Sequence, residues 1–459
     1  MAPFLMHQPE LRIMLKRVFL VLAVVTGLQL CASTPNIIMI LADDLGYGDL
    51  GCYGNRRNST PHLDALAARG LRFTDYHSAG AMCSPTRASM LTGLYPQRFG
   101  ADFDGALGDN PKREVGLPLV AVTIAEIIKE RGYATACVGK WHLGFKAPLI
   151  PTRQGFDLFR GLLGEDGDHH THINRYGKED WYANEQLTME AGYTADLLTR
   201  HSTEFIQEHR DRPFFLYLPH LAIHFPWQGP DDPPHRQKGV NYSQDKWGTI
   251  PDPANVAPHV QAMVESLDRS VGRVMETLRR LGLEENTMVI FTSDNGGYID
   301  YAPGFRQISS NGIFRGQKTE IYEGGHRVPL IVSWPGRIRP GVSDGLVHSN
   351  DWMPTLLRLA GPKAEPTPSD GLDLLPHMMH GEPLPMRTLF WRARKGHAVR
   401  RGPWKLCVTG QKSELFHLGD DPGETTDRAG AEPALVRELS AAWARWNEDV
   451  NRSAASLGR

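Results

Sequence analysis

The stretch NIIMILADD, residues 36–44, runs from six consecutive apolar residues directly into two aspartates. An apolar run without alternation indicates a β-strand that is buried on both faces. Similar strands are expected at 133–138, 213–218, 287–291 and 328–332, and amphipathic helices at 123–131, 194–209, 260–281 and 351–359. Strands that alternate with helices predict an α/β domain with a mostly parallel sheet covered on both faces.

The sequence pattern of the chain changes after a Pro-rich passage that begins at Gly361. Four short antiparallel strands are expected beyond it, at 389–393, 397–400, 404–408 and 415–418, followed by a helix at 433–448. We therefore expect a main domain at 34–360 and a smaller α+β subdomain at 361–459.

The first 33 residues differ from the rest. Lys16 and Arg17 precede an apolar run at 18–30, and small residues follow at 31–33. This pattern is typical of a secretory signal peptide and is too short for a stable membrane span. Residues 28–31 loosely resemble a lipoprotein cleavage site, although Leu30 is large for that position. We expect a soluble exported protein, periplasmic or secreted, or lysosomal or extracellular in a eukaryote.

Composition excludes several functions. The 459 residues are 41% hydrophobic and 22% charged, with a formal net charge of −2 and no long run of one sign. Nucleic acid is therefore not an expected partner, and an anionic substrate must be bound by a local site. Beyond the leader, Cys52, Cys83, Cys137 and Cys407 are too few for a disulfide scaffold.

Chemically active residues collect where the predicted strands end, which is where open parallel sheets bind ligands. The four ends carry Asp43-Asp44, Lys140 with His142, His220 with His224, and Asp294-Asn295. One aspartate pair alone is more often a turn or a helix cap. The second pair favours an all-oxygen metal site made of Asp43, Asp44, Asp294 and Asn295, suited to Ca²⁺ and less to Mg²⁺.

The segment CSPTR, residues 83–87, places a cysteine beside a predicted helix N-terminus. Pro85 fits the first helical position, so exposed backbone N–H groups would favour negative charge at Cys83. The residue type leaves two simple alternatives open, a buried apolar cysteine and a thiolate nucleophile paired with histidine.

The same segment resembles the Cys-x-Pro-x-Arg signature of the formylglycine-dependent type I sulfatases. Further blocks resemble that family in the same order, namely LADDLGYGDL at 41–50, GKWHLG at 139–144, TSDNGG at 292–297, GQK at 316–318 and EGGHRVP at 323–329. The resemblance implies an alkaline-phosphatase-like fold with a smaller C-terminal domain. It also implies that a maturation enzyme oxidises Cys83 to formylglycine.

The resemblance implies a role for each site residue. The hydrated aldehyde at position 83 would be the nucleophile and also a metal ligand, so Cys83 joins the metal set. One hydroxyl takes the sulfuryl group to form a sulfo-enzyme intermediate, and proton loss from the other expels sulfate. Arg87 would stabilise the aldehyde, Lys140 and Lys318 would bind sulfate, His142 would act as base, and His224 as acid. His220 is the less favoured alternative to His224.

The resemblance is nearest to the arylsulfatase A and N-acetylgalactosamine-6-sulfatase branch, which implies a sulfated carbohydrate substrate. The alternatives are a phosphonate or phosphodiester hydrolase of the same fold and a non-catalytic sulfated-glycan binding protein. Residues 164–184 are expected to form an exposed polar loop, although Asp166, Asp168 and the histidines at 169, 170 and 172 could read sugar hydroxyls or bind a second metal. Trp181 and Tyr182 would suit stacking on a sugar.

Overall fold

The computed structural model describes residues 34–108, 115–250, 252–301, 304–361 and 367–458. The predicted signal peptide, residues 1–33, lies outside the described residues. Contacts gather residues 35–459 into one unit. The boundary near residue 360 and the export of the protein remain predictions. Within the described ranges, no helix combines the length and apolarity needed to cross a bilayer.

The described residues contain a ten-stranded sheet, ordered β11-β2-β10-β9-β1-β8-β4-β5-β6-β7. Its central strands β1 (Asn36–Ala42), β8 (Phe214–Pro219), β9 (Thr287–Ser293) and β4 (Ala134–Lys140) run parallel. The remaining strands are β2 (Leu71–Phe73), β5 (Leu158–Leu162), β6 (Tyr182–Ala183), β7 (Gln186–Leu187), β10 (Leu330–Ser333) and β11 (Gly341–Ser343). β10 pairs antiparallel with β9. The predicted α/β class is confirmed.

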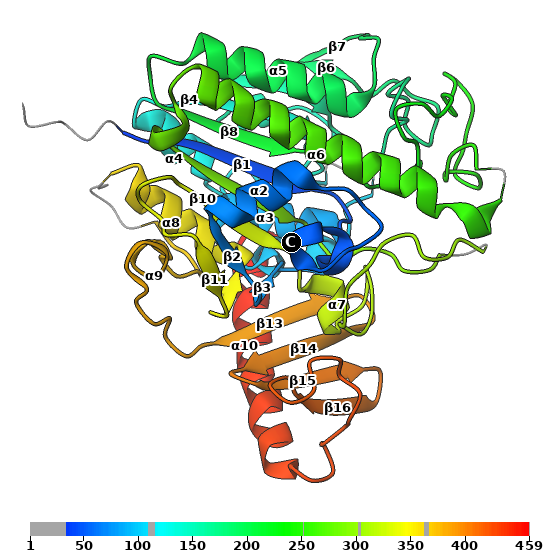
Figure 1. Cartoon of the computed structure of the whole chain (residues 1–459). Helices are drawn as coiled ribbons and strands as arrows, with labels where there is room; N and C mark the ends of the chain where they lie inside the picture. Colours follow the sequence, from blue (N-terminus) through cyan, green and yellow to red (C-terminus); the bar gives the residue numbers. More distant parts are fainter. Residues whose placement is uncertain (1–33, 109–114, 251, 302–303, 362–366, 459) are drawn as a thin grey trace, which may run out of the picture. The chain divides into compact units, whose positions relative to one another are not determined.

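Successive residues of β1 enter two different hydrophobic cores, which explains why the strand is apolar without alternation. Ile37, Met39 and Leu41 pack on one face, and Ile38 and Ile40 on the other. The first face is covered by α3 (Cys83–Thr92), α4 (Ile124–Glu130) and α8 (Trp352–Leu359). The second is covered by α2 (Pro61–Arg69), α5 (Thr194–Glu208) and α6 (Ala257–Arg280), of which α5 and α6 run side by side (Figure 1).

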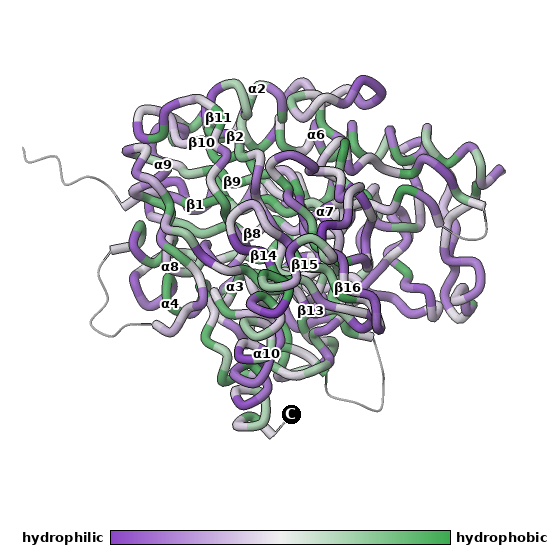
Figure 2. The backbone as a smooth tube through the Cα atoms, turned by 90° about the horizontal axis from the view of Figure 1, so that it is seen from below, coloured by the Kyte–Doolittle hydropathy of each residue, from purple (hydrophilic) through white to green (hydrophobic). Residues whose placement is uncertain are grey.

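The C-terminal part forms a separate antiparallel sheet, as predicted. Its strands are β13 (Thr388–Ala393), β14 (Gly396–Arg401), β15 (Trp404–Thr409) and β16 (Lys412–His417). The final helix α10 (Pro433–Ser456) contacts this sheet and is longer than the predicted 433–448. Hydrophilic and hydrophobic residues alternate along α10 (Figure 2). Its buried residues Leu439, Ala442, Trp446, Val450 and Ala454 recur at helical spacing.

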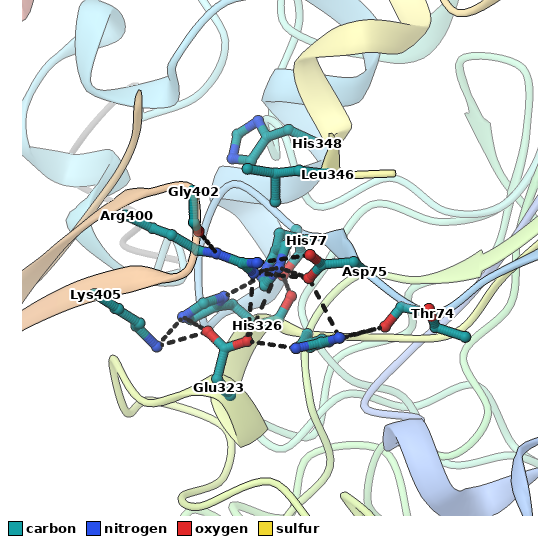
Figure 3. Close-up of polar contacts among 12 residues, drawn as sticks. Thr74, Asp75, His77, Glu323, His326, Leu346, His348, Arg400, Gly402 and Lys405 are labelled. Carbon is teal, nitrogen blue, oxygen red and sulfur yellow. Dashed lines mark hydrogen bonds and ion pairs between the residues drawn. The ribbon is translucent and has the colours of Figure 1, made fainter. Parts of the chain in front are cut away.

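A buried charge network joins this small sheet to the two-stranded sheet of β3 (Tyr76–His77) and β12 (Val347–His348) and to α7 (Glu323–His326) (Figure 3). It links β3 and α7 to β14 and β15. Lys405 Nζ lies 2.9 Å from a Glu323 carboxylate oxygen. The two imidazoles of His77 and His326 meet at 2.9 Å between their Nδ1 atoms. Their Nε2 atoms face Arg400 and Lys405 at 2.8 and 3.1 Å. Protein cations therefore occupy the positions that a metal ion would need.

Three further elements complete the described secondary structure: β12 (Val347–His348), which pairs with β3, α9 (Leu375–His380), and a set of short 3₁₀ turns. α3 begins at Cys83 itself, so Pro85 is its third residue rather than its first, a correction to the sequence-based expectation. The physical consequence is small. Cys83 still lies at the helix N-terminus, where free N–H groups point toward the sheet edge.

Candidate active site

Two aspartate-containing turns meet at the carboxyl edge of the sheet. Asp43 and Asp44 follow β1, and Asp294 and Asn295 follow the neighbouring strand β9. Asp44 adopts a left-handed φ of 62°, a conformation that aspartate tolerates better than most residues. Its backbone N–H donates to Asp294 Oδ1 at 3.2 Å, which ties the two turns together. Register between parallel strands therefore brings the two pairs into contact.

Four of the predicted metal ligands form one cluster. Ligand atoms of Asp43, Asp44, Cys83 and Asp294 all lie within 4.8 Å of one another, and all four residues are buried. Asn295 Nδ2 donates to Asp44 Oδ1 at 2.8 Å. Asn295 Oδ1 is buried and has no hydrogen-bond partner among the described residues. A buried amide oxygen beside three carboxylates fits a hard divalent cation.

The Cys83 thiol lies between two lysines and an aspartate. Its Sγ is 3.4 Å from Lys318 Nζ, 3.8 Å from Lys140 Nζ and 3.4 Å from Asp43 Oδ1. The lysines are also paired with the metal-site carboxylates, Lys140 with Asp43 at 2.5 Å and Lys318 with Asp44 at 2.6 Å. Two cations therefore converge on the position where an anionic group would meet residue 83.

Arg87 lies one helical turn after Cys83 and is fully buried. Its guanidinium donates to Asp294 Oδ2 at 3.0 and 2.8 Å and to the Lys140 carbonyl at 2.5 Å. It also reaches Asp43 Oδ2 at 3.3 Å. These contacts hold the carboxylates in place, and among the described residues the Arg87 guanidinium makes no hydrogen bond to the Cys83 thiol.

The two predicted acid–base histidines present different nitrogens. His142 Nε2 lies 2.9 Å from the Leu107 carbonyl, so this nitrogen donates a proton, and Nδ1 has no partner among the described residues. His224 Nδ1 lies 2.9 Å from the Phe225 carbonyl, which leaves Nε2 facing Asp44 at 3.9 Å. A His224 ring nitrogen also lies within 4.8 Å of the Cys83 Sγ. Among the described residues, His142 makes no hydrogen bond or ion pair with Cys83, and it is coupled to the site electrostatically through Lys140.

Burial dominates the electrostatics of the site. It raises the pKa of Cys83 well above its ordinary value and, with Lys140 and Lys318 nearby, holds the pKa of His224 well below. Burial and Lys140 likewise lower the pKa of His142. Both imidazoles are therefore neutral at pH 7, and an unmodified Cys83 is a thiol rather than a thiolate. The simple alternative of a thiolate nucleophile is not supported by this environment.

The polar cluster in the loop at 164–184 is buried, which corrects the sequence-based expectation of an exposed loop, although Tyr176, Lys178 and Asn184 are exposed. Asp166, Asp168, His169 and His172 are each at most 3% exposed. The Asp168 carboxylate accepts a hydrogen bond from the backbone N–H of His170 in the same loop and another from the backbone N–H of Arg236 in a second loop. Asp166, Asp168 and His169 are engaged in hydrogen bonds that shape the loop, whereas the buried His172 Nε2 has no hydrogen-bond partner among the described residues. Residue identity alone did not reveal this.

Trp181 and His220 also take structural positions. Trp181 is 1% exposed and its ring stacks on His172 at 4.3 Å, so it is closed to a sugar, whereas Tyr182 is partly exposed. His220 Nε2 faces Ser270 of α6 at 3.2 Å. His224 is therefore the better placed histidine of the two.

A group of side chains beside His224 carries no recognisable sequence pattern. Phe225, Trp247 and Tyr301 surround the Lys246 ammonium, and Arg175 lies over Phe225. No spacing signal marks them, because they come from three separate loops. The only hint in the sequence is the local density of aromatic residues at 225–247.

Buried carboxylates that could hold a cation, a buried residue 83 and two converging lysines suit a hydrolase centre for an anionic ester on an α/β sheet. Residues 35–362 match the family model described as Sulfatase. The chain is 35% identical over 454 residues to human arylsulfatase A, covering 92% of this chain and 84% of that protein. The chain belongs to the sulfatase family and is a sulfuric ester hydrolase.

Other relatives extend the comparison. The N-acetylgalactosamine-6-O-sulfatase of Bacteroides thetaiotaomicron is 31% identical over 498 residues, covering 89% of this chain and 92% of that protein. Among solved structures, Ps i-CgsB in complex with k-i-k-neocarrahexaose superposes with a TM-score of 0.78 at 29% identity, covering 90% of this chain and 93% of the other. A phosphonate monoester hydrolase of Agrobacterium radiobacter, at 18% identity and a TM-score of 0.62, shares the fold.

Proposed function

We propose that the protein hydrolyses sulfate monoesters of a sulfated carbohydrate through a formylglycine at position 83. The observation that carries the proposal is the convergence of Lys318, Lys140 and Asp43 on the Cys83 side chain, at 3.4, 3.8 and 3.4 Å. A single buried residue that touches both cations and a metal-type carboxylate suits a nucleophile whose substrate is an anion. Nothing in this arrangement needs the thiol itself.

Asp43, Asp44, Asp294 and Asn295, with the side chain at position 83, would hold the metal ion. The unpartnered Asn295 Oδ1 and the three carboxylates form an all-oxygen donor set, which favours Ca²⁺ and, less strongly, Mg²⁺. Such an ion, when bound, would supply positive charge that polarises oxygen groups near residue 83. Arg87 would hold Asp294 and Asp43 in position, because its guanidinium bonds to both.

The remaining residues would handle charge and protons. Lys140 and Lys318 would bind the sulfate oxygens as they exchange their present carboxylate partners for substrate. His142 carries its free lone pair on Nδ1, which suits a base. His224 has Nε2 toward the site, and the charge of a bound sulfate would favour its protonation, as an acid requires. A formylglycine hydrate would supply one hydroxyl to accept the sulfuryl group and another whose ionisation releases it.

A sulfated carbohydrate is proposed on the basis of several relatives. Two of them are named N-acetylgalactosamine-6-sulfatase or 6-O-sulfatase, and one structure was solved with k-i-k-neocarrahexaose. We also propose export, because the apolar run at 18–30 follows Lys16-Arg17. A maturation enzyme that oxidises Cys83 is then required as a partner.

The test uses protein coproduced with a formylglycine-generating enzyme and loaded with Ca²⁺. Peptide mass spectrometry across residues 83–87 reports the aldehyde, and initial rates are compared on sulfate monoesters and phosphate diesters. The proposal expects an aldehyde and a clear preference for sulfate monoesters. Faster turnover of phosphate diesters would favour the phosphodiesterase alternative, and no turnover by aldehyde-containing protein would favour a binding protein.

A further inference from the structure

The Lys246 ammonium lies in a cluster of aromatic rings beside the active site. Its Nζ is 4.8 Å from the Trp247 ring centroid, 5.2 Å from that of Phe225 and 5.8 Å from that of Tyr301. We call these four residues the Lys246 cluster. Trp247 and Tyr301 are partly exposed, whereas Phe225 is buried, so the cluster has a solvent-facing side and a side toward the protein.

The cluster touches the catalytic machinery at two points. The Phe225 ring lies 4.1 Å from the His224 ring. On the other side, Tyr301 meets Tyr298 at 4.6 Å, and the Lys318 ammonium lies 5.3 Å from the Tyr298 ring. A continuous belt of rings therefore connects Lys246 to the leaving-group histidine and to a sulfate-binding lysine. Any substituent on a sugar bound at this edge would approach the belt.

Among the described charged side chains around the cluster, Lys246 lacks an ion-pair partner. Arg175 pairs with Glu165 at 3.0 Å and with Asp166 at 2.9 Å, and Arg236 pairs with Asp166 at 3.0 Å. Across the part of the chain that the structure describes, no carboxylate lies within ion-pair distance of Lys246 Nζ. Three cations thus face two carboxylates, and the surplus charge is on Lys246.

The position of Lys246 is held from its main chain. Arg236 Nη2 donates to the Lys246 carbonyl at 3.0 Å while it pairs with Asp166. The ammonium therefore projects from a backbone that is tied to a buried ion pair. Partial burial of an unpaired cation costs free energy that contacts with ring faces offset only in part. A partner of opposite charge would complete the site.

We propose that the Lys246 cluster is a subsite for a second anionic group, a sulfate or carboxylate on the sugar next to the scissile sulfate ester. Lys246 supplies the charge, and the partly exposed rings of Trp247 and Tyr301 supply an aromatic surface for a sugar. The inference rests on the proposed function and deepens it. It assigns a doubly anionic glycan as the preferred substrate, with the cluster acting in specificity rather than in bond cleavage.

The test compares three probes on the converted, Ca²⁺-loaded enzyme: a hexosamine 6-sulfate, the same sugar with a second sulfate, and the same monosulfated sugar linked to a uronate. We expect a higher kcat/KM for one or both doubly anionic probes. Lys246→Met should lower kcat/KM for the preferred probe about tenfold more than for the monosulfated sugar, the size of one charged hydrogen bond. Lys246→Arg should restore most of the difference, and the two doubly anionic probes tell sulfate from carboxylate.

Lys238→Met is the matched control. Lys238 belongs to the same segment and pairs with Glu179 at 2.7 Å on an exposed position, so this change removes an equal charge outside the cluster. The control should leave the ratio of kcat/KM values as in the wild type. Equal loss on all three probes, or the same ratio change in Lys238→Met, would overturn the subsite.

A binding measurement separates the subsite from turnover. Calorimetry on the unconverted Cys83 protein measures the affinity for the disulfated and the uronate-linked probes. Lys246→Met should bind the preferred of these two probes about tenfold more weakly than the wild type does. If the converted wild type hydrolyses no sulfate ester, the proposed function fails while this binding experiment still decides the subsite. Equal affinity of wild type and Lys246→Met for both probes overturns the inference.

Discussion

The Lys318 ammonium lies 3.4 Å from the Cys83 thiol, although 235 residues separate them in the chain. Cys83 begins α3, and Lys318 lies in the loop that precedes α7. Both are buried, and Asp44 pairs with the same ammonium at 2.6 Å. The proposed metal ligand Asp44 and the proposed nucleophile at position 83 thus share one cation. We therefore expect a change at any of the three residues to alter the electrostatics of the other two.

Removal of the Cys83 side chain should abolish turnover while the fold persists. Cys83→Ala removes the thiol that a maturation enzyme would oxidise, so no formylglycine can form and we expect sulfatase activity to fall by at least about 10³-fold. Initial rates on a sulfate monoester measure the loss of turnover, and circular dichroism at pH 7 shows whether the fold persists. Cys52→Ala, at a partly exposed cysteine outside the site, is the control and should stay active. Retained turnover in pure Cys83→Ala protein would contradict the mechanism.

Asp294 should couple metal affinity to catalysis. Asp294→Ala removes one carboxylate of the cluster and leaves the buried Arg87 without its 2.8 Å partner. We expect Ca²⁺ to bind at least about tenfold more weakly, with turnover falling in parallel. Titration calorimetry with Ca²⁺ measures the first quantity. Asp300→Ala, an exposed residue of the same loop, serves for comparison. Unchanged metal content would remove Asp294 from the ligand set.

The buried network in Figure 3 should contribute strongly to stability. Lys405→Met leaves Glu323 and Glu424 without a cation that lies 2.9 Å from each. Breaking a buried pair by removing one partner costs about 3–5 kcal/mol of unfolding free energy. Urea denaturation reports the loss.

Lys412→Met is the control for that experiment. Its ammonium pairs with Glu414 at 2.8 Å but is 67% exposed, so the loss should stay below about 1 kcal/mol. Similar losses for the two variants would show that the buried network adds nothing beyond a surface pair.

Stability should fall at mildly acidic pH through His220. Burial lowers the pKa of His220 from its ordinary 6.5 to about 3. Below pH 6.5 His220 becomes protonated in the unfolded chain, whereas in the folded chain it stays neutral down to about pH 3. Acid therefore favours the unfolded state. The loss for this residue approaches about 1.4 kcal/mol per pH unit. Urea denaturation at pH 5.0, 6.0 and 7.0 should show the trend.

His220→Asn should reduce that pH dependence by the contribution of one group, at most about 1.4 kcal/mol per pH unit. Other buried histidines, such as His77 and His169, also have lowered pKa values and keep the rest of the slope. Its stability at pH 7 also reports the loss of the contact with Ser270. His62→Asn, at an exposed histidine, provides the comparison. An identical pH slope in His220→Asn and wild type would assign the acid sensitivity to other groups.

Much of the fold could be predicted because it depends on local pattern. The apolar run that became β1, the four parallel strands and the small C-terminal sheet follow from hydrophobic periodicity. Clustering of Asp43-Asp44 with Asp294-Asn295 followed from a general property of parallel sheets, whose carboxyl ends share one edge. The helix start at Cys83 was missed by two residues because a proline is tolerated anywhere in the first turn.

The residue types of the site, its sheet edge and its family were determined by the sequence itself, since they reside in short contiguous blocks. Only the tertiary structure decided which polar side chains are engaged in hydrogen bonds and ion pairs within the fold and which are left for a ligand. Asp166 and Asp168 of the loop at 164–184 are buried by contacts with Gln228 and Arg236. Lys246 has no carboxylate partner among the described residues, because Arg175 and Arg236 pair with Glu165 and Asp166. Pairing of charges depends on distances between loops, and no local pattern encodes those distances.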